Sequence, residues 1–519
     1  MSQKIRRLFQ VLTLCVWCQP GLTVDIEQLG NIEFPTSATE AAQEHFLIGL
    51  AYLHSFGWNQ ARSEFQQAQL LDANFALAYW GEMLTYNHPL YPEKDAVSPV
   101  RVLNKLGTST EERLSKAASE LENGFLIAAE AYAYTEGDGY SRRMAYLQTM
   151  QSLFEKFPDH PEVRAFYALS LLSAASELPG NQWFQLRQQA GAIVNTLFLE
   201  NFSHPGAIHY LIHSYDDPDN AHLALAAADR YVDIAPLVAH ARHMPSHIYI
   251  HLGKWFDAAD LNETAFYNAR ALWLPGDNPI EQNHAMDFGQ YADLQLANYE
   301  AAAVWIERAK ETLLQNPDDL DTANTVARLQ ARLIVESRQW QFTPVDITQT
   351  NDELFAIGLS AINMRDLALA RDANQILKDR TKINAENIPL LISQLELEAS
   401  LLFADGNTAA SLIVIDKAIS LARQNPNTDP LPNPLKPVHE LKGELLLSSG
   451  RAEPAIRAFE QSLLATPFRP WTLLGLARSH KALGDNIQAS DYYRQLLESW
   501  EDSRLLGVSE AKTHLSIYQ

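Results

Sequence analysis

The chain has 519 residues, more than one hydrophobic core of about 100–200 residues can hold, so we expect several domains or one elongated array. Hydrophobic residues make up 47% and charged residues 20%, a globular composition that excludes a disordered chain. The formal net charge of −23 repels phosphate backbones and so excludes nucleic acid as a partner, whereas it attracts cations and metal ions.

The first predicted element is an export signal over residues 1–23. Three basic residues precede the apolar run Leu8–Cys18, and the helix breaker Pro20 follows. This run is too short to span a bilayer, and no later run approaches about 18 apolar residues. We therefore expect no membrane span and a periplasmic or secreted protein. Both cysteines lie inside the signal, so its removal would leave no thiolate ligand and no disulfide. The alternative is an N-terminal helix that frays.

The next element is a repeat unit in the stretch HFLIGLAYLHSFGWNQARSEFQQAQLLDANF. Its Gly49, Tyr52, Ala61, Phe65 and Ala68 have the spacing G-x2-Y…A-x3-F-x2-A, in which small residues alternate with aromatic ones along two helices. Apolar residues at helical spacing continue along the chain, and no long segment alternates with period two. The sequence therefore predicts an all-α fold.

The first repeat also carries polar candidates for a site. They are His45, His54, Glu82 and His88, the last two in the stretch YWGEMLTYNHPLY. The alternative is that these side chains pack or are solvated, as a Trp-Gly-Glu on a helix more often is.

The middle of the chain is rich in histidine. Eight of the sixteen histidines fall within residues 204–251. His209 and His243 are 34 residues apart, and so are His213 and His247. Residues i and i+4 share one face of a helix, so His209 and His213 point the same way. This spacing indicates two equivalent repeat units that place their histidines alike.

A linker and a second pair of repeats end the chain. Residues 424–437, QNPNTDPLPNPLKP, are rich in Pro and Asn and predict the linker. Beyond it, residues 438–519 repeat the first pattern with Gly443, Ala455 and Phe459, and a further unit follows at once. We expect a repeat pair and a capping helix here.

These patterns resemble tetratricopeptide (TPR) repeats. The resemblance implies a right-handed solenoid of helical hairpins over residues 38–423, in which small residues let two helices approach and an aromatic fills the gap to the next unit. The stretches YWGE…NHP, HPGA-x-HY and HMPSHI together resemble a group of bacterial TPR proteins over about residues 40–310. This second resemblance implies the fold and no particular chemistry.

The TPR resemblance also implies which histidines line the groove. In such proteins positions 2, 5, 9, 12 and 13 of each first helix face the concave side, and the histidines of residues 204–290 occupy several of these positions. We expect them to reach a common ion from neighbouring helices, whose axes lie about 8–10 Å apart. The predicted metal ligands are His209, His213, His243, His247, His284, His240, Asp216 and Asp287.

Pro245 lies between His243 and His247 and leaves two alternatives for the local backbone. Either a new helix begins at the proline, or the helix bends there. In the first case His240 and His243 lie on a connecting segment. The i,i+4 argument then holds only for His209 with His213 and for His247 with His251.

Two functions stay open. The first is an exported solenoid that binds a transition metal (zinc, copper or iron) in its concave groove, with or without activity as a metal-dependent hydrolase or oxidoreductase. No P-loop, dinucleotide fingerprint, Gly-x-Ser-x-Gly or HExxH motif is present, so only metal chemistry is favoured. The second is a non-catalytic scaffold that binds a peptide or protein partner in the groove, where the histidines would grip an acidic segment.

Overall fold

The computed structural model describes residues 26–91, 95–176, 178, 181–273, 278–425, 431–500, 503 and 505–518. The predicted export signal lies outside the described residues. Helices and turns account for the described chain, which contains no strand. Among the described helices, none has the length and apolar character needed to cross a membrane.

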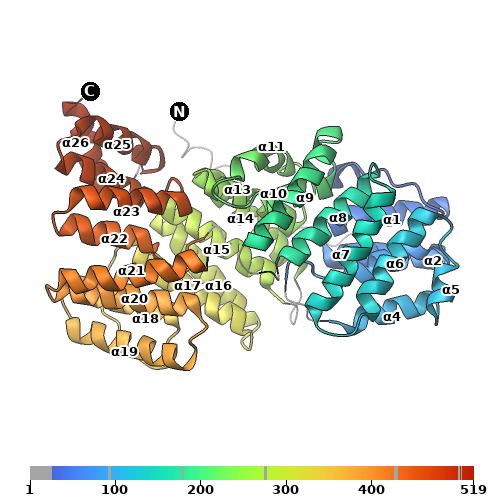
Figure 1. The fold of residues 1–519 in the computed structure, drawn as a ribbon, viewed down its shortest axis with the longest axis horizontal. Coiled ribbons are helices and arrows are strands. Elements are labelled where there is room, and N and C mark those ends of the chain that lie inside the picture. The colour runs from blue at the N-terminus through green and yellow to red at the C-terminus, as the bar shows by residue number, and fades with distance from the viewer. Residues whose placement is uncertain are drawn as a thin grey trace.

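The helices follow one another as hairpins, and each packs mainly on its neighbours in the chain (Figure 1). The first half consists of η2 (Ile26–Leu29), α1 (Glu40–His54), α2 (Trp58–Leu71), α3 (Ala76–Leu84), α4 (Val97–Leu106), α5 (Thr110–Leu114), α6 (Glu120–Tyr134), α7 (Gly139–Lys156), α8 (Pro161–Ala175), α9 (Asn181–Glu200), α10 (Pro205–Ser214), α11 (Ala221–Tyr231), α12 (Ala239–His243), α13 (Pro245–His251) and α14 (Trp255–Leu272).

The second half continues the hairpins to the other end of the molecule (Figure 1). Its helices are α15 (Ile280–Gln295), α16 (Tyr299–Gln315), α17 (Leu320–Ser337), α18 (Asn351–Asn363), α19 (Leu367–Ile383), α20 (Ile388–Ala404), α21 (Thr408–Gln424), α22 (Val438–Ser448), α23 (Ala452–Ala465), α24 (Pro470–Ala482), α25 (Asn486–Trp500) and α26 (Leu506–Ile517).

One packing device recurs between the two helices of a hairpin. A Cβ at Gly49 on α1 would approach the Phe65 ring on α2 to 3.0 Å, and a Cβ at Gly443 on α22 would approach Phe459 on α23 to 2.6 Å. Phe459 also lies against Gly475 of the next helix, α24, at 2.4 Å from a Cβ there. The aromatic therefore fills the space that two glycines leave, which confirms the helical-hairpin solenoid expected from the spacing.

The C-terminal repeats fold back against the middle of the array. The turn at Gly253, after α13, packs against Phe468, and Trp500 on α25 donates its indole N–H to the carbonyl of Gln295 on α15 at 2.9 Å. Gly253 has a φ of +69°, and a Cβ there would lie 2.7 Å from the Cβ of Phe468, so only glycine fits. The array is thus closed upon itself around α15 and α17.

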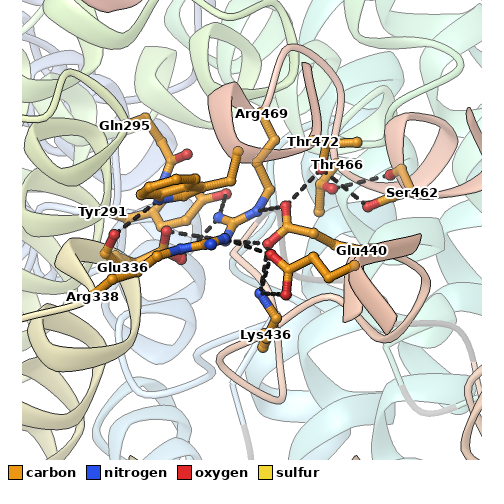
Figure 2. A network of polar contacts seen from close by, with 12 residues as sticks. Tyr291, Gln295, Glu336, Arg338, Lys436, Glu440, Ser462, Thr466, Arg469 and Thr472 are labelled. Carbon is orange, nitrogen blue, oxygen red and sulfur yellow. Dashed lines mark hydrogen bonds and ion pairs between the residues drawn. The ribbon is translucent and has the colours of Figure 1, made fainter. Parts of the chain in front are cut away.

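A buried ionic network fastens this closure (Figure 2). Arg469, at the start of α24, donates from Nε to Glu440 on α22 at 2.7 Å and pairs through Nη1 with Glu336 on α17 at 2.8 Å. Tyr291 accepts a longer bond from the same guanidinium, and Lys436 pairs with Glu440 at 3.0 Å. Because three separate helices meet at one guanidinium, the network fixes their register.

Close to this network, Glu396 on α20 is buried, and neither carboxyl oxygen has a hydrogen-bond partner among the described residues. Burial raises the pKa of Glu396 well above its usual value; Lys436 lowers it, and the weaker influence of nearby glutamates raises it further. The folded chain therefore keeps Glu396 protonated, whereas the unfolded chain releases this proton above about pH 4.5. The free energy of unfolding therefore falls as pH rises above this value.

Glu396→Leu is expected to raise the free energy of unfolding at pH 8 by about 1–3 kcal/mol, because it removes a buried polar group that has no partner. Glu396→Gln removes only the ionisation and should flatten the loss of stability between pH 5 and pH 8. Thermal melting across this range measures both effects. Equal pH profiles for Glu396→Gln and the unchanged protein would contradict the burial of a neutral carboxyl here.

Candidate metal centre

The histidines of α10 are placed by the way in which the helix begins. His204 caps it, because its Nδ1 accepts from the amide of Ala207 at 3.1 Å, and Pro205 occupies the first helical position. His209 and His213 follow one turn apart, and their Nε2 atoms lie 3.0 Å from each other. This pair points the same way, as the i,i+4 spacing predicts.

At Pro245 a new helix begins, which is the first of the two alternatives. Met244 nevertheless keeps helical dihedral angles, donates to the carbonyl of His240 at 3.0 Å and accepts from the amide of His247 at 3.2 Å. The backbone therefore stays helical across the junction between α12 and α13. His243 and His247 still face each other, with their Nε2 atoms 2.8 Å apart, so their pairing survives the break between α12 and α13.

Six of the predicted ligands are brought together in two groups. Their imidazole nitrogens lie close enough within each group to share one ion. Group A consists of His209, His213 and His240, and group B consists of His243, His247 and His284. His240 reaches group A from α12 at 3.1 Å from His209, whereas His284 reaches group B from α15 with its ring centroid 4.3 Å from that of His243.

Hydrogen-bond acceptors on the outer side of two imidazole rings determine which nitrogen of each ring carries the proton. Nδ1 of His209 lies 2.6 Å from the carbonyl of His54, and Nδ1 of His243 lies 2.6 Å from Oδ1 of Asn262. The Asn262 amide is oriented by its own bond to Ala258, so Oδ1 is the atom that accepts. Because a carbonyl can only accept, each Nδ1 donates its proton and each Nε2 keeps a free lone pair inside its group.

Asp216 supports group B from behind instead of joining it. Its carboxylate lies 2.7 Å from Nδ1 of His247 and 3.3 Å from Nε2 of His251, and both neighbours hold its pKa well below the usual value despite burial, which raises it. A carboxylate on the outer nitrogen of an imidazole orients the ring and makes it a better ligand. Asp216 is therefore placed as a support, and not in the inner position that the sequence predicts.

Asp287, the other predicted carboxylate ligand, is turned away from both groups. It pairs with Arg332 at 2.7 Å and with Arg328 at 2.9 Å, on the side of α15 that faces α17. Asp287 follows His284 by three residues, but Arg328 and Arg332 of α17 hold its carboxylate, so it does not join group B.

Glu281 is the residue that sequence reasoning misses. It lies 3.4 Å from Nδ1 of His240, and burial raises its pKa while His240, His284 and His88 together lower it to below the usual value. Its carboxylate therefore meets His240 on the nitrogen that faces away from His209. The signal was present in the sequence, since Glu281 precedes His284 by three residues on one helix and shares its face.

Most of the imidazoles are buried, whereas one ring in each group, that of His213 and that of His284, stays partly exposed. His209 is 0% exposed, His243 2%, and His247 7%. Phe56 lies 4.5 Å from His209 between ring centroids, and Phe288 lies 4.5 Å from His247. These two aromatic rings pack directly on the imidazoles of His209 and His247.

Burial keeps the imidazoles neutral. It lowers the pKa of His209, His213 and His243 well below 6.5, and the neighbouring imidazoles lower each further. Burial, and then His247, lower the pKa of His284 to about 4. A neutral imidazole is the form that binds a metal, so these rings are in the ligating state at neutral pH.

A third cluster, His54, Glu162 and His204, has a different character. Both imidazoles meet the carboxylate through Nε2, at 2.7 Å for His54 and 2.9 Å for His204. Tyr210 bonds the outer nitrogen of His54 at 2.9 Å. Donors and acceptors alternate throughout, so the cluster is satisfied without an ion and acts as a structural support behind His209.

The other candidates of the first repeat are also engaged in packing or pairing. His45 pairs with Glu64 at 2.6 Å, Glu82 pairs with Lys105 at 2.9 Å, and His88 stacks on Trp58 with ring centroids 4.7 Å apart. The packing alternative therefore describes these residues.

No family model matches the chain, and no curated protein matches it in sequence. Solved structures do match. They include Cut9–Hcn1 from an APC/C hetero-tetramer (12% identity, 91% of this chain and 76% of that chain, TM-score 0.31) and the P58(IPK) TPR domain (13%, 92% and 99%, 0.22). An IFIT1 monomeric mutant with Gppp-AAAA matches at 13% identity over 89% of this chain and 91% of that chain, with a TM-score of 0.36. Because all three TM-scores lie below 0.5, the fold is assigned from the helix pairing itself, which is that of a TPR-like solenoid.

Proposed function

We propose that this protein binds two transition-metal ions, one in group A and one in group B. The observation that carries the proposal is the convergence of Nε2 lone pairs at 2.8–3.1 Å, with the outer nitrogen of the ring committed to an acceptor at His209, His243 and His247. In group B both outer nitrogens are committed, so the Nε2 lone pairs of His243 and His247 repel each other unless a cation or a proton lies between them. Ligands about 2.0–2.1 Å from a tetrahedral ion stand roughly 3.3 Å apart, close to the spacing here.

The donor set favours zinc, copper or ferrous iron, since it is made of imidazole with no thiolate. Three protein ligands leave each ion an open position, where a water or a substrate atom would bind. Glu281 lies 3.4 Å from Nδ1 of His240, the outer nitrogen of that ring, and would orient the ring as a ligand. This arrangement suits a metal-dependent hydrolase or oxidoreductase.

The alternative of a peptide gripped by the histidines is less well supported. Phe56 and Phe288 pack on His209 and His247, and most of the six imidazoles are buried, so a peptide would reach few of the rings directly. A scaffold role would therefore use another face of the solenoid.

Metal content tests the proposal. The protein, purified without a histidine tag, is stripped with a chelator and reconstituted separately with Zn²⁺, Cu²⁺ or Fe²⁺ under argon before plasma mass spectrometry. We expect about two equivalents of one metal. His213→Ala (group A) and His247→Ala (group B) should each lose about one equivalent, and the double variant both, because each ion loses a third of its ligands.

His222→Ala, at an exposed position on α11, is the matched control and should keep both ions. Circular dichroism verifies that each variant retains its helices. An unchanged metal content in His213→Ala, or a protein that takes up no metal on reconstitution, would overturn the proposal.

A further inference from the structure

A cavity of about 470 Å³ lies beside the histidine groups, between α9 and the C-terminal repeats. Trp183, Phe184 and Arg187 of α9 form one wall, and Asp216 and His251 lie at its inner end. Apolar side chains of the C-terminal half, among them Ile392 and Leu464, form the other wall. This volume is in the range of small-molecule sites, about 300–1,000 Å³.

Arg187 is the unusual group in this cavity. It forms no hydrogen bond or ion pair within the described chain, and its guanidinium lies 5.0 Å from the centre of the Trp183 ring. Burial lowers the pKa of Arg187, whereas the nearby carboxylates of Asp216 and Asp217 raise it. Arg187 is partly exposed and lines the cavity, so its charged guanidinium can pair with an anion that binds there.

The two carboxylates near Arg187, those of Asp216 and Asp217, each have partners other than the guanidinium. Asp216 is held by His247 at 2.7 Å, and Asp217 accepts from the amides of Asp219 and Asn220 where α11 begins, at 3.1 and 3.0 Å. Neither forms an ion pair with the guanidinium, so Arg187 remains free to pair with a ligand in the cavity.

We propose that this cavity binds a small organic anion whose acidic group pairs with Arg187 and whose planar apolar body lies against Trp183 and Phe184. A guanidinium presents two parallel N–H donors to a carboxylate or sulfonate, and an indole face accepts a flat ring. The site goes beyond metal binding and needs no metal, although Asp216 touches both the cavity and His247.

Two fluorescent probes of one shape test the proposal on the full, chelator-treated chain. 1-Anilinonaphthalene-8-sulfonate carries the anion, and N-phenyl-1-naphthylamine is the same body without it. We expect one sulfonate probe per chain, bound at least 10-fold more tightly than the neutral probe. Arg187→Gln should weaken the sulfonate probe at least 10-fold and change the neutral probe less than 2-fold. Trp183→Ala should weaken both.

Arg371→Gln is the matched control, because Arg371 lies on the surface of α19, outside the cavity, where it pairs with Asp405. It should bind both probes as the unchanged protein does. Near-UV circular dichroism verifies the tertiary structure, and Trp183→Ala serves as the second variant if Arg187→Gln does not fold. Equal binding of both probes, or undiminished binding of the sulfonate probe by Arg187→Gln, would overturn the proposal. Because no metal is added, this result is independent of metal content.

Discussion

Arg469→Met is expected to lower the free energy of unfolding of the C-terminal repeats by about 3–5 kcal/mol. The substitution leaves the carboxylates of Glu336 and Glu440 buried without the guanidinium that lies 2.8 and 2.7 Å from them. Lys436 still pairs with Glu440, so Glu336 bears most of the loss. Hydrogen exchange resolved by peptide, over residues 438–500 and over α15 and α17, measures the change where it occurs.

Two further variants separate charge from packing at this network. Arg457→Met changes an exposed arginine on α23 that pairs with Glu453 and should cost less than about 1 kcal/mol. Adding Glu336→Gln and Glu440→Gln to Arg469→Met removes the stranded charges and should restore much of the stability. A loss in Arg469→Met no larger than that in Arg457→Met would show that the closure does not depend on the buried charges.

The hairpin fold could be predicted because its signal is local. Gly49 and Phe65 are 16 residues apart, so the spacing within one repeat unit predicts their contact. The same spacing at Gly443 and Phe459 repeats the contact at the far end. A 34-residue period also predicted that His209 and His213 would meet the histidines of the next unit.

The 34-residue period did not predict how the histidines divide between group A and group B. His240 joins His209 and His213, whereas its helix partner His243 joins His284, because the two ends of α12 face different neighbours. The division depends on how α12 crosses α10 and α15, and the crossing is set by side chains throughout both interfaces.

The enclosure of the groups depends on contacts that are distant in the sequence. Phe56 closes over His209 from about 150 residues away, in a turn where its φ is +56°. The cavity at Arg187 likewise needs the C-terminal repeats to return to α9, which the buried network at Arg469 makes possible. Neither contact has a local sequence pattern, so the spacing predicted that these histidines come together but not which side chains cover them.

The chelator-treated protein is expected to lose stability steeply as pH falls from about 6.5 toward 4. The folded state keeps His209, His213 and His243 neutral well below pH 6.5 and His284 neutral to about pH 4, because burial and neighbouring imidazoles lower each pKa. The unfolded chain takes up these protons near pH 6.5. It therefore binds more protons in this window, and the free energy of unfolding falls by at most about 1.4 kcal/mol per pH unit for each such histidine.

Melting temperature against pH, with and without the bound metal, measures this effect. His284→Gln should reduce the slope between pH 6.5 and 4, whereas His222→Gln, at the exposed position on α11, should leave it unchanged. A bound ion competes with protons for the same lone pairs, so it should move the loss of stability to lower pH. A flat profile in the chelator-treated protein would contradict buried neutral imidazoles. A steep profile that does not shift when metal is added would support buried neutral imidazoles, but it would contradict metal binding by these imidazoles.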